Sequence, residues 1–212
     1  MIRIKRRWKV LSLALGACAL AAVIVGSGAS AASKNSAIAF TMVRSTAAAN
    51  ANCLPHAGAL VSVRSSGPTE TMVVRVHGLR PNTEFDFFVI QVPNKPFGLA
   101  WYQGDIDTDS HGNGTGVFVG RFSIETFIVA QGSATAPVVH DQGPNPDANS
   151  NPVTAPVHTF HLGLWFNSPV DAANAGCTGA VTPFNGDHNA GIQVLSTRNA
   201  ADDQGPLRNL TP

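Results

Sequence analysis

Apolar and polar residues alternate with a period of two along most of the chain, and clusters of glycine, proline, asparagine and aspartate separate the alternating segments. Period-two alternation is typical of strands with one buried face, whereas an amphipathic helix needs a period near 3.6. Hydrophobic residues make up 44% of the 212 residues and charged residues only 13%. A core can therefore form, but long helices covered with lysine and glutamate are excluded. We predict an all-β fold.

Nine segments carry the strand pattern, and each is short and bounded by turn residues. They are 38–43, 59–64, 70–77, 84–92, 99–103, 116–122, 124–130, 157–166 and 191–197. Nine short strands favour a β-sandwich, in which two sheets pack face to face.

One short helix is predicted after residue 167. Ser168 is a favourable N-cap, Pro169 suits the first helical position, and Asp171 lies near the positive end of the helix dipole. Gly176 is a typical helix stop, so this helix delivers Cys177 to whatever partner it has.

The first 31 residues have the pattern of a cleaved signal peptide. Five basic residues precede position 10, an apolar stretch runs over 10–26, and Ala29 and Ala31 are the small residues that a signal peptidase accepts. We therefore expect a secreted, extracellular protein that begins near Ala32. Two alternatives keep it at the membrane: an uncleaved signal that serves as an anchor, and a lipidated Cys18 within the sequence Leu-Gly-Ala-Cys.

Cleavage changes the charge of the chain. Five of the 14 basic residues but none of the 13 acidic residues lie within 1–31, so nine basic and 13 acidic residues remain, a formal net charge of −4. Such a domain has no electrostatic footprint for nucleic acid and no polybasic patch for anionic lipid. We expect no nucleic-acid partner and no membrane span after cleavage.

Cleavage also leaves an even pair of cysteines, Cys53 and Cys177. Thiols in an oxidising compartment tend to end as disulfides. We predict a Cys53–Cys177 disulfide. It crosses residues 131–156, which are rich in proline, asparagine and glycine and are expected to form a long loop. We therefore predict one β-sandwich domain over 32–199, followed by a flexible tail over 200–212.

Residues 76–92 carry the most specific local motif. A strand ends at Gly78 and Leu79, the chain turns through Pro81 and Thr83, and the next strand begins at Phe85. This motif resembles the corner of fibronectin type III domains, in which Gly-Leu-x-Pro-x-Thr precedes a strand that begins with tyrosine. The resemblance implies an immunoglobulin-like sandwich and no particular ligand, and phenylalanine at the tyrosine position removes the corner's hydroxyl hydrogen bond. The whole chain also resembles secreted bacterial proteins that have no assigned activity.

Three carboxylates at alternate positions, Asp105, Asp107 and Asp109, form the densest set of potential metal ligands. An EF-hand loop does not fit, because Ser110 and Gly116 stand where glycine and a bidentate glutamate are needed. The simpler interpretation is a β-hairpin with these carboxylates on one solvent face and a turn over 110–114. A weak calcium site at the same carboxylates is the alternative, and we expect no other cofactor.

Seven histidines lie beyond the signal peptide, among them His158 and His161. On a strand, spacing three places these two rings on opposite faces, and no His-x-His pair like that of copper–zinc superoxide dismutases is present. His158, His161, Asp187 and His188 could still form a metal-binding or metal-dependent catalytic cluster, which is the alternative function.

Aromatic side chains provide candidates for binding. Strand 157–166 places Leu162 and Leu164 inward and His161 and Trp165 on the other face, where Trp165 is either covered by loop 131–156 or exposed as a platform. Many secreted sandwiches bind sugars by stacking the ring on an aromatic face. The candidate ligand-binding residues are Trp101, Tyr102, His161, Trp165 and His188.

No nucleophile motif appears in the sequence, and carboxylate pairs for glycoside chemistry cannot be identified from sequence because they meet only in space. We expect a non-catalytic secreted module that binds a glycan or a protein at the cell surface. A structural protein without a ligand is a further alternative.

Overall fold

Eight antiparallel strands and two short α-helices form the described part of the chain, which a computed structural model gives for residues 36–123, 158–179, 181–182 and 189–211. In chain order the elements are β1 (Ala37–Arg44), α1 (Thr46–Asn50), β2 (Gly58–Ser66), β3 (Thr69–His77), β4 (Glu84–Ile90), β5 (Ala100–Asp107), β6 (Gly114–Gly120), β7 (His161–Phe166), α2 (Pro169–Asn174), β8 (Gln193–Ser196) and the 3-10 helix η1 (Pro206–Asn209). The all-β prediction is confirmed. Each strand overlaps one of the nine predicted segments, although β5 runs four residues beyond the predicted 99–103. The remaining segment, 124–130, lies outside the described residues.

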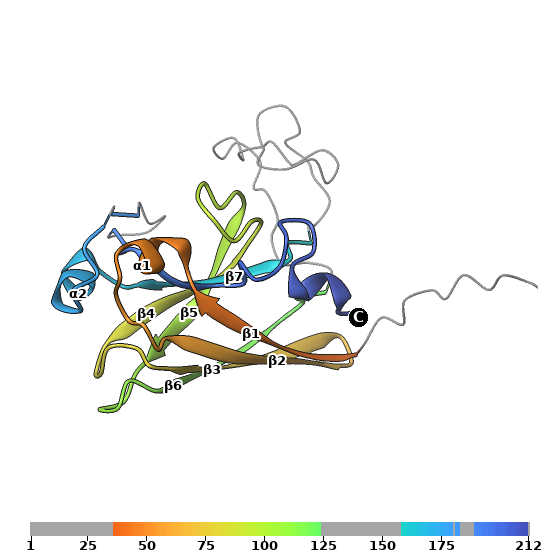
Figure 1. Cartoon of the computed structure of the whole chain (residues 1–212). Coiled ribbons are helices and arrows are strands. Elements are labelled where there is room, and N and C mark those ends of the chain that lie inside the picture. The colour runs from red at the N-terminus through yellow and green to blue at the C-terminus, as the bar shows by residue number, and fades with distance from the viewer. Residues whose placement is uncertain (1–35, 124–157, 180, 183–188, 212) are drawn as a thin grey trace, which may run out of the picture. The chain divides into compact units, whose positions relative to one another are not determined.

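The strands are hydrogen-bonded in the order β5-β4-β7-β8-β1-β2-β3-β6. Figure 1 shows β1, β2 and β3 side by side within this order. β8 and β1 pair only at Ser196 with Val43 and at Leu195 with Arg44, whereas β2 pairs with β3 along its whole length. The short β8–β1 join divides the sheet into a β4 half (β5-β4-β7-β8) and a β2 half (β1-β2-β3-β6).

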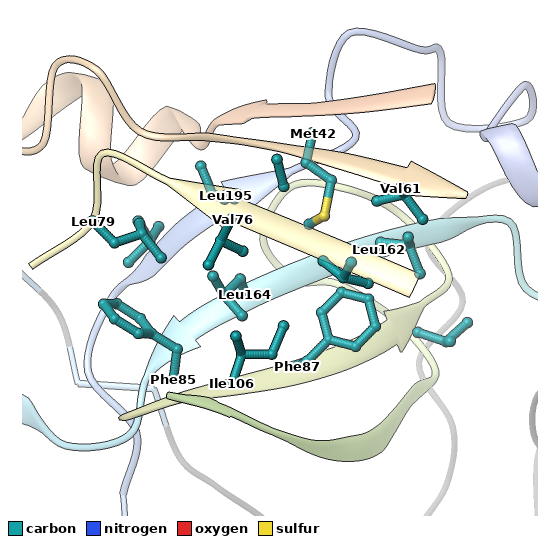
Figure 2. Close-up of a cluster of buried hydrophobic side chains, with 14 of the residues drawn as sticks. Met42, Val61, Val76, Leu79, Phe85, Phe87, Ile106, Leu162, Leu164 and Leu195 are labelled. Atoms are coloured by element: carbon teal, nitrogen blue, oxygen red, sulfur yellow. The ribbon is translucent and has the colours of Figure 1, made fainter. Parts of the chain in front are cut away.

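The core lies between these two halves and follows the predicted alternation. Figure 2 shows Met42, Val61 and Val76 of the β2 half across from Phe85, Phe87 and Ile106 of the β4 half. The Phe87 ring on β4 stacks on Phe118 of β6 with a centroid distance of 4.9 Å. Strands from opposite ends of the sheet order are therefore packed face to face.

Two capped helices and a disulfide connect segments that are far apart in sequence. The Ser168 hydroxyl caps α2 at the Asp171 amide, as predicted, and Gly176 follows the helix with φ of 70°. The predicted Cys53–Cys177 disulfide is present and joins residues 124 positions apart. It fixes the chain after α1 to the chain after α2.

The sequence predicts a flexible tail from residue 200, and here the structure differs. η1 begins at Pro206, Leu207 and Leu210 are buried, and the Leu207 amide donates to the Phe160 carbonyl. Two leucines three residues apart give the tail a hydrophobic anchor, which outweighs its polar composition. Among the described helices, none is long and apolar enough to cross a bilayer.

Candidate functional site

β5 and β6 occupy the two ends of the sheet order and are joined by a tight turn. Thr108 and Gly114 form a bridge at this turn, and the Asp109 carboxylate accepts from the His111 and Asn113 amides at 2.8 and 2.9 Å. These two hydrogen bonds lower the pKa of Asp109. The predicted turn over 110–114 is confirmed, but the two strands then separate, because β5 pairs with β4 and β6 with β3.

A hollow of about 380 Å³ opens between β5 and the end of β6, and we call it the seam hollow. It is lined by Trp101, Tyr102, Gln103, Val119, Gly120, Arg121 and Phe122. Trp101 is 42% exposed and Tyr102 is 39% exposed, so two large aromatic side chains of β5 remain accessible.

A β-bulge decides which way these aromatic residues face. Phe87 pairs with Gly104 and Phe88 with Tyr102, so Gln103 is an extra residue on β5. The extra residue reverses the alternation beyond it. Trp101 therefore pairs with the inward-facing Val89, on the side where the seam hollow lies, although strict alternation from Ile106 would turn Trp101 outward.

Tyr102 faces the other side of β5. Its ring lies 5.5 Å from that of Phe88, and its hydroxyl donates to Asp105 Oδ1 at 2.5 Å. Burial and the neighbouring Asp105 carboxylate raise the pKa of Tyr102 well above its ordinary value. The phenol is thus a hydrogen-bond donor over the whole physiological pH range.

Carboxylates gather on the outer face of β4 and β5, although not in the predicted set. Glu84, Asp86 and Asp105 place one ligand atom each within 4.8 Å of one another, and this is the group of described residues that could hold a divalent cation. Asp107 lies opposite Glu84 in the register, and Asp109 is engaged in the turn. The sequence did not identify Glu84 and Asp86 as members, because only the pairing of β4 with β5 brings them to Asp105.

Trp165 is buried, with 3% of its surface exposed, by residues of the β4–β5 connection and the outer face of β4. Phe97 and Phe88 contact its ring edge-to-face at centroid distances of 5.0 and 5.2 Å. Of the two alternatives that the sequence left open for Trp165, an exposed binding platform is therefore wrong. Loop 131–156, which we expected to cover Trp165, lies outside the described residues.

His161 is fully buried and hydrogen-bonded. Its Nε2 lies 3.0 Å from the Asp202 carbonyl and 3.2 Å from the Ala201 carbonyl, so Nε2 carries the hydrogen and donates to them. Nδ1 then accepts from the Thr197 hydroxyl at 2.8 Å, and that oxygen accepts from the Leu162 amide. Burial lowers the pKa of His161, which keeps the ring neutral.

The predicted histidine and aspartate cluster is not assembled among the residues that the structure describes. His158 lies at the start of the described segment 158–179, and His161 donates to the Asp202 carbonyl. Asp187 and His188 lie outside the described residues. No histidine belongs to the potential metal-ligand group of the described chain.

Comparison with known proteins adds no family: no protein-family model and no curated protein sequence matches the chain.

Proposed function

We propose that the protein is exported, that it is an immunoglobulin-like β-sandwich, and that it is a non-catalytic module that binds a glycan at the cell surface through the seam hollow. The observation that carries this proposal is the accessible side chain of Trp101 in a hollow of about 380 Å³, with Tyr102 exposed on the opposite face of the same strand. An exposed aromatic residue in a concave site is characteristic of a binding surface.

The composition of the seam hollow suits a sugar better than a purely apolar ligand. An aromatic face accepts the C–H side of a pyranose ring, while hydroxyl groups need polar partners at the rim. Trp101 offers the face, and Gln103 and Arg121 line the same hollow with amide and guanidinium groups.

The disulfide supports export. Cys53 and Cys177 are joined, and both are buried. Disulfides persist in oxidising compartments and are rare in the cytosol. Edman sequencing of the mature protein is expected to begin at Ala32; a chain that still carries residues 1–31, or that begins at a lipidated Cys18, would instead place the module on the membrane.

The test is binding of the purified protein to polysaccharide fractions of cell-wall material, measured by affinity electrophoresis. Trp101→Ala should weaken retardation about two- to tenfold, because a stacking aromatic contributes about 0.5–1.5 kcal/mol. Trp101→Phe should retain part of the binding. Leu60→Ala is the matched control, because Leu60 is 48% exposed and does not line the seam hollow.

Three outcomes separate this proposal from its alternatives. Retardation that Trp101→Ala leaves unchanged would rule out the seam hollow as the glycan site. Binding that requires calcium and is lost in chelator would favour the carboxylates of Glu84, Asp86 and Asp105 instead. Failure to bind every fraction would favour a protein partner or a structural role.

A further inference from the structure

A second hollow, the α1 groove, has a volume of about 960 Å³. It is lined by α1, by the β4–β5 connection at residues 94–97, by residues 178, 179, 181 and 182, and by Ile192 and Gln193. None of these residues lines the seam hollow. The volume lies at the upper end of the range of small-molecule sites.

The charge of the α1 groove favours an anion. Lys95 is the charged residue among those that line it, and none of those residues is a carboxylate. The other polar lining groups are neutral amides and hydroxyls, such as those of Asn50 and Thr178. Among the described residues that line the groove, a ligand carboxylate therefore meets one ammonium group and no like charge.

Gln193 reaches this groove because of a second β-bulge. Leu164 pairs with Leu195 and Trp165 with Gln193, so Val194 is an extra residue on β8. Strict alternation from the core residue Leu195 would turn Gln193 into the core. The bulge instead turns Gln193 to the outer face beside Trp165, and Val194 joins Leu195 in the core.

Gln193 and Trp165 carry donors that the described residues do not satisfy. Gln193 is 4% exposed and Trp165 3%, and neither Gln193 Nε2 nor Trp165 Nε1 has a hydrogen-bond partner within the described part of the chain. A buried donor without an acceptor is costly. The terminal torsion of glutamine is broad, so the Gln193 amide can turn toward an acceptor in the groove at little cost.

The apolar wall of the groove is held in place, and Phe97 connects it to Trp165, which does not itself line the groove. Phe97, Pro96 and Ile192 line it, and Phe97 is fixed with its ring edge-to-face against Trp165. The Thr46 hydroxyl donates to Asn94 Oδ1 at 2.8 Å and ties α1 to the β4–β5 connection. The groove is therefore built before a ligand arrives.

We propose that the α1 groove binds a small carboxylic acid with an apolar body. Lys95 pairs with the carboxylate, the Gln193 amide donates to one carboxylate oxygen, and the apolar body packs against Phe97. This site is separate from the glycan site, so either proposal can fail without the other.

Benzoate, with benzamide as its uncharged counterpart, is the probe for this site. Both are titrated into the purified ¹⁵N-labelled protein, and the Gln193 side-chain amide and the Trp165 indole N–H are followed by NMR. Benzoate is expected to shift both signals with saturation at a Kd on the order of 1–10 mM, as its size allows. The indole signal of Trp101, which does not line the groove, should not move.

Lys95→Gln should weaken benzoate binding about fivefold or more and abolish its preference over benzamide, because the ion pair is lost. Lys95 is exposed, so this variant keeps the fold. Arg75→Gln is the matched control, because it removes one positive charge from the exposed face of β3. Unshifted Gln193 and Trp165 signals, equal affinity for benzamide, or equal effects of the Lys95 and Arg75 variants would each overturn the proposal.

Discussion

Removal of the Cys53–Cys177 disulfide should destabilise the protein more than any single loss of a surface contact. The bridge joins residues 124 positions apart, and the chain-entropy relation for a loop of this length gives about 5 kcal/mol. Measured losses for native disulfides are typically about 2–4 kcal/mol, because the unfolded chain is less free than the relation assumes. We therefore expect a loss of about 2–5 kcal/mol.

Urea unfolding of the wild type and of the double variant Cys53→Ala/Cys177→Ala measures this loss. With a slope of about 2 kcal/mol per molar urea, the midpoint should fall by about 1–2.5 M. The wild type in reductant should unfold near the midpoint of the double variant, which separates loss of the cross-link from repacking around the buried alanines. A midpoint change below about 0.5 M, in either comparison, would show that the long loop does not control stability.

Three further changes test the packing and the hydrogen bonds. Gly163→Ala should cost about 1–3 kcal/mol in urea unfolding, because its Cβ would overlap the Trp165 ring and lie 2.9 Å from Gln193 Nε2; an unchanged midpoint would contradict this packing. The pKa of His161 is lowered in the folded protein, so the unfolded state takes up the proton first and the free energy of unfolding should fall as pH drops below about 6.5. The expected slope is up to about 1.4 kcal/mol per pH unit. His161→Gln should remove that part of the slope, and an identical pH profile in this variant would refute the buried, neutral state of His161. Ser45→Ala should cost about 1–3 kcal/mol, because the buried Ser45 hydroxyl caps α1 and donates to the Gln193 carbonyl; a loss below about 0.5 kcal/mol would show that another group replaces it.

The regular part of the fold follows from local rules and is therefore predictable from the sequence. Alternation locates the described strands, and Ser168 and Gly176 mark the ends of α2, because each signal depends on neighbouring residues only. α1 was not predicted: Ser45 gives its N-cap, but only five residues follow, too few for a helical period to be seen.

The candidate sites depend instead on which strands pair. Asp105 was a candidate, but its partners Glu84 and Asp86 come from another strand, and only the β4–β5 register brings them together. His161 and Trp165 were correctly placed on the outer face of their strand. Loop 131–156 was expected to cover that outer face, or else to leave it open. Phe97 and the 201–202 segment instead lie against it, and no local pattern predicts such a long-range contact.

Both proposed binding regions adjoin a β-bulge, and this gives them a common physical origin. The extra residue Gln103 turns Trp101 toward the seam hollow, and the extra residue Val194 turns Gln193 toward the α1 groove. In each case the bulge places the side chain on the face opposite to the one that strict alternation would give it. Bulges are frequent beside functional sites because they redirect a side chain without changing the rest of the sheet. Deletion of Gln103 should restore regular pairing but leave Trp101 opposite Val89, on the side of the seam hollow. Glycan retardation and a cooperative unfolding transition should therefore both remain; loss of retardation in a folded deletion variant would show that the bulge itself is needed for binding.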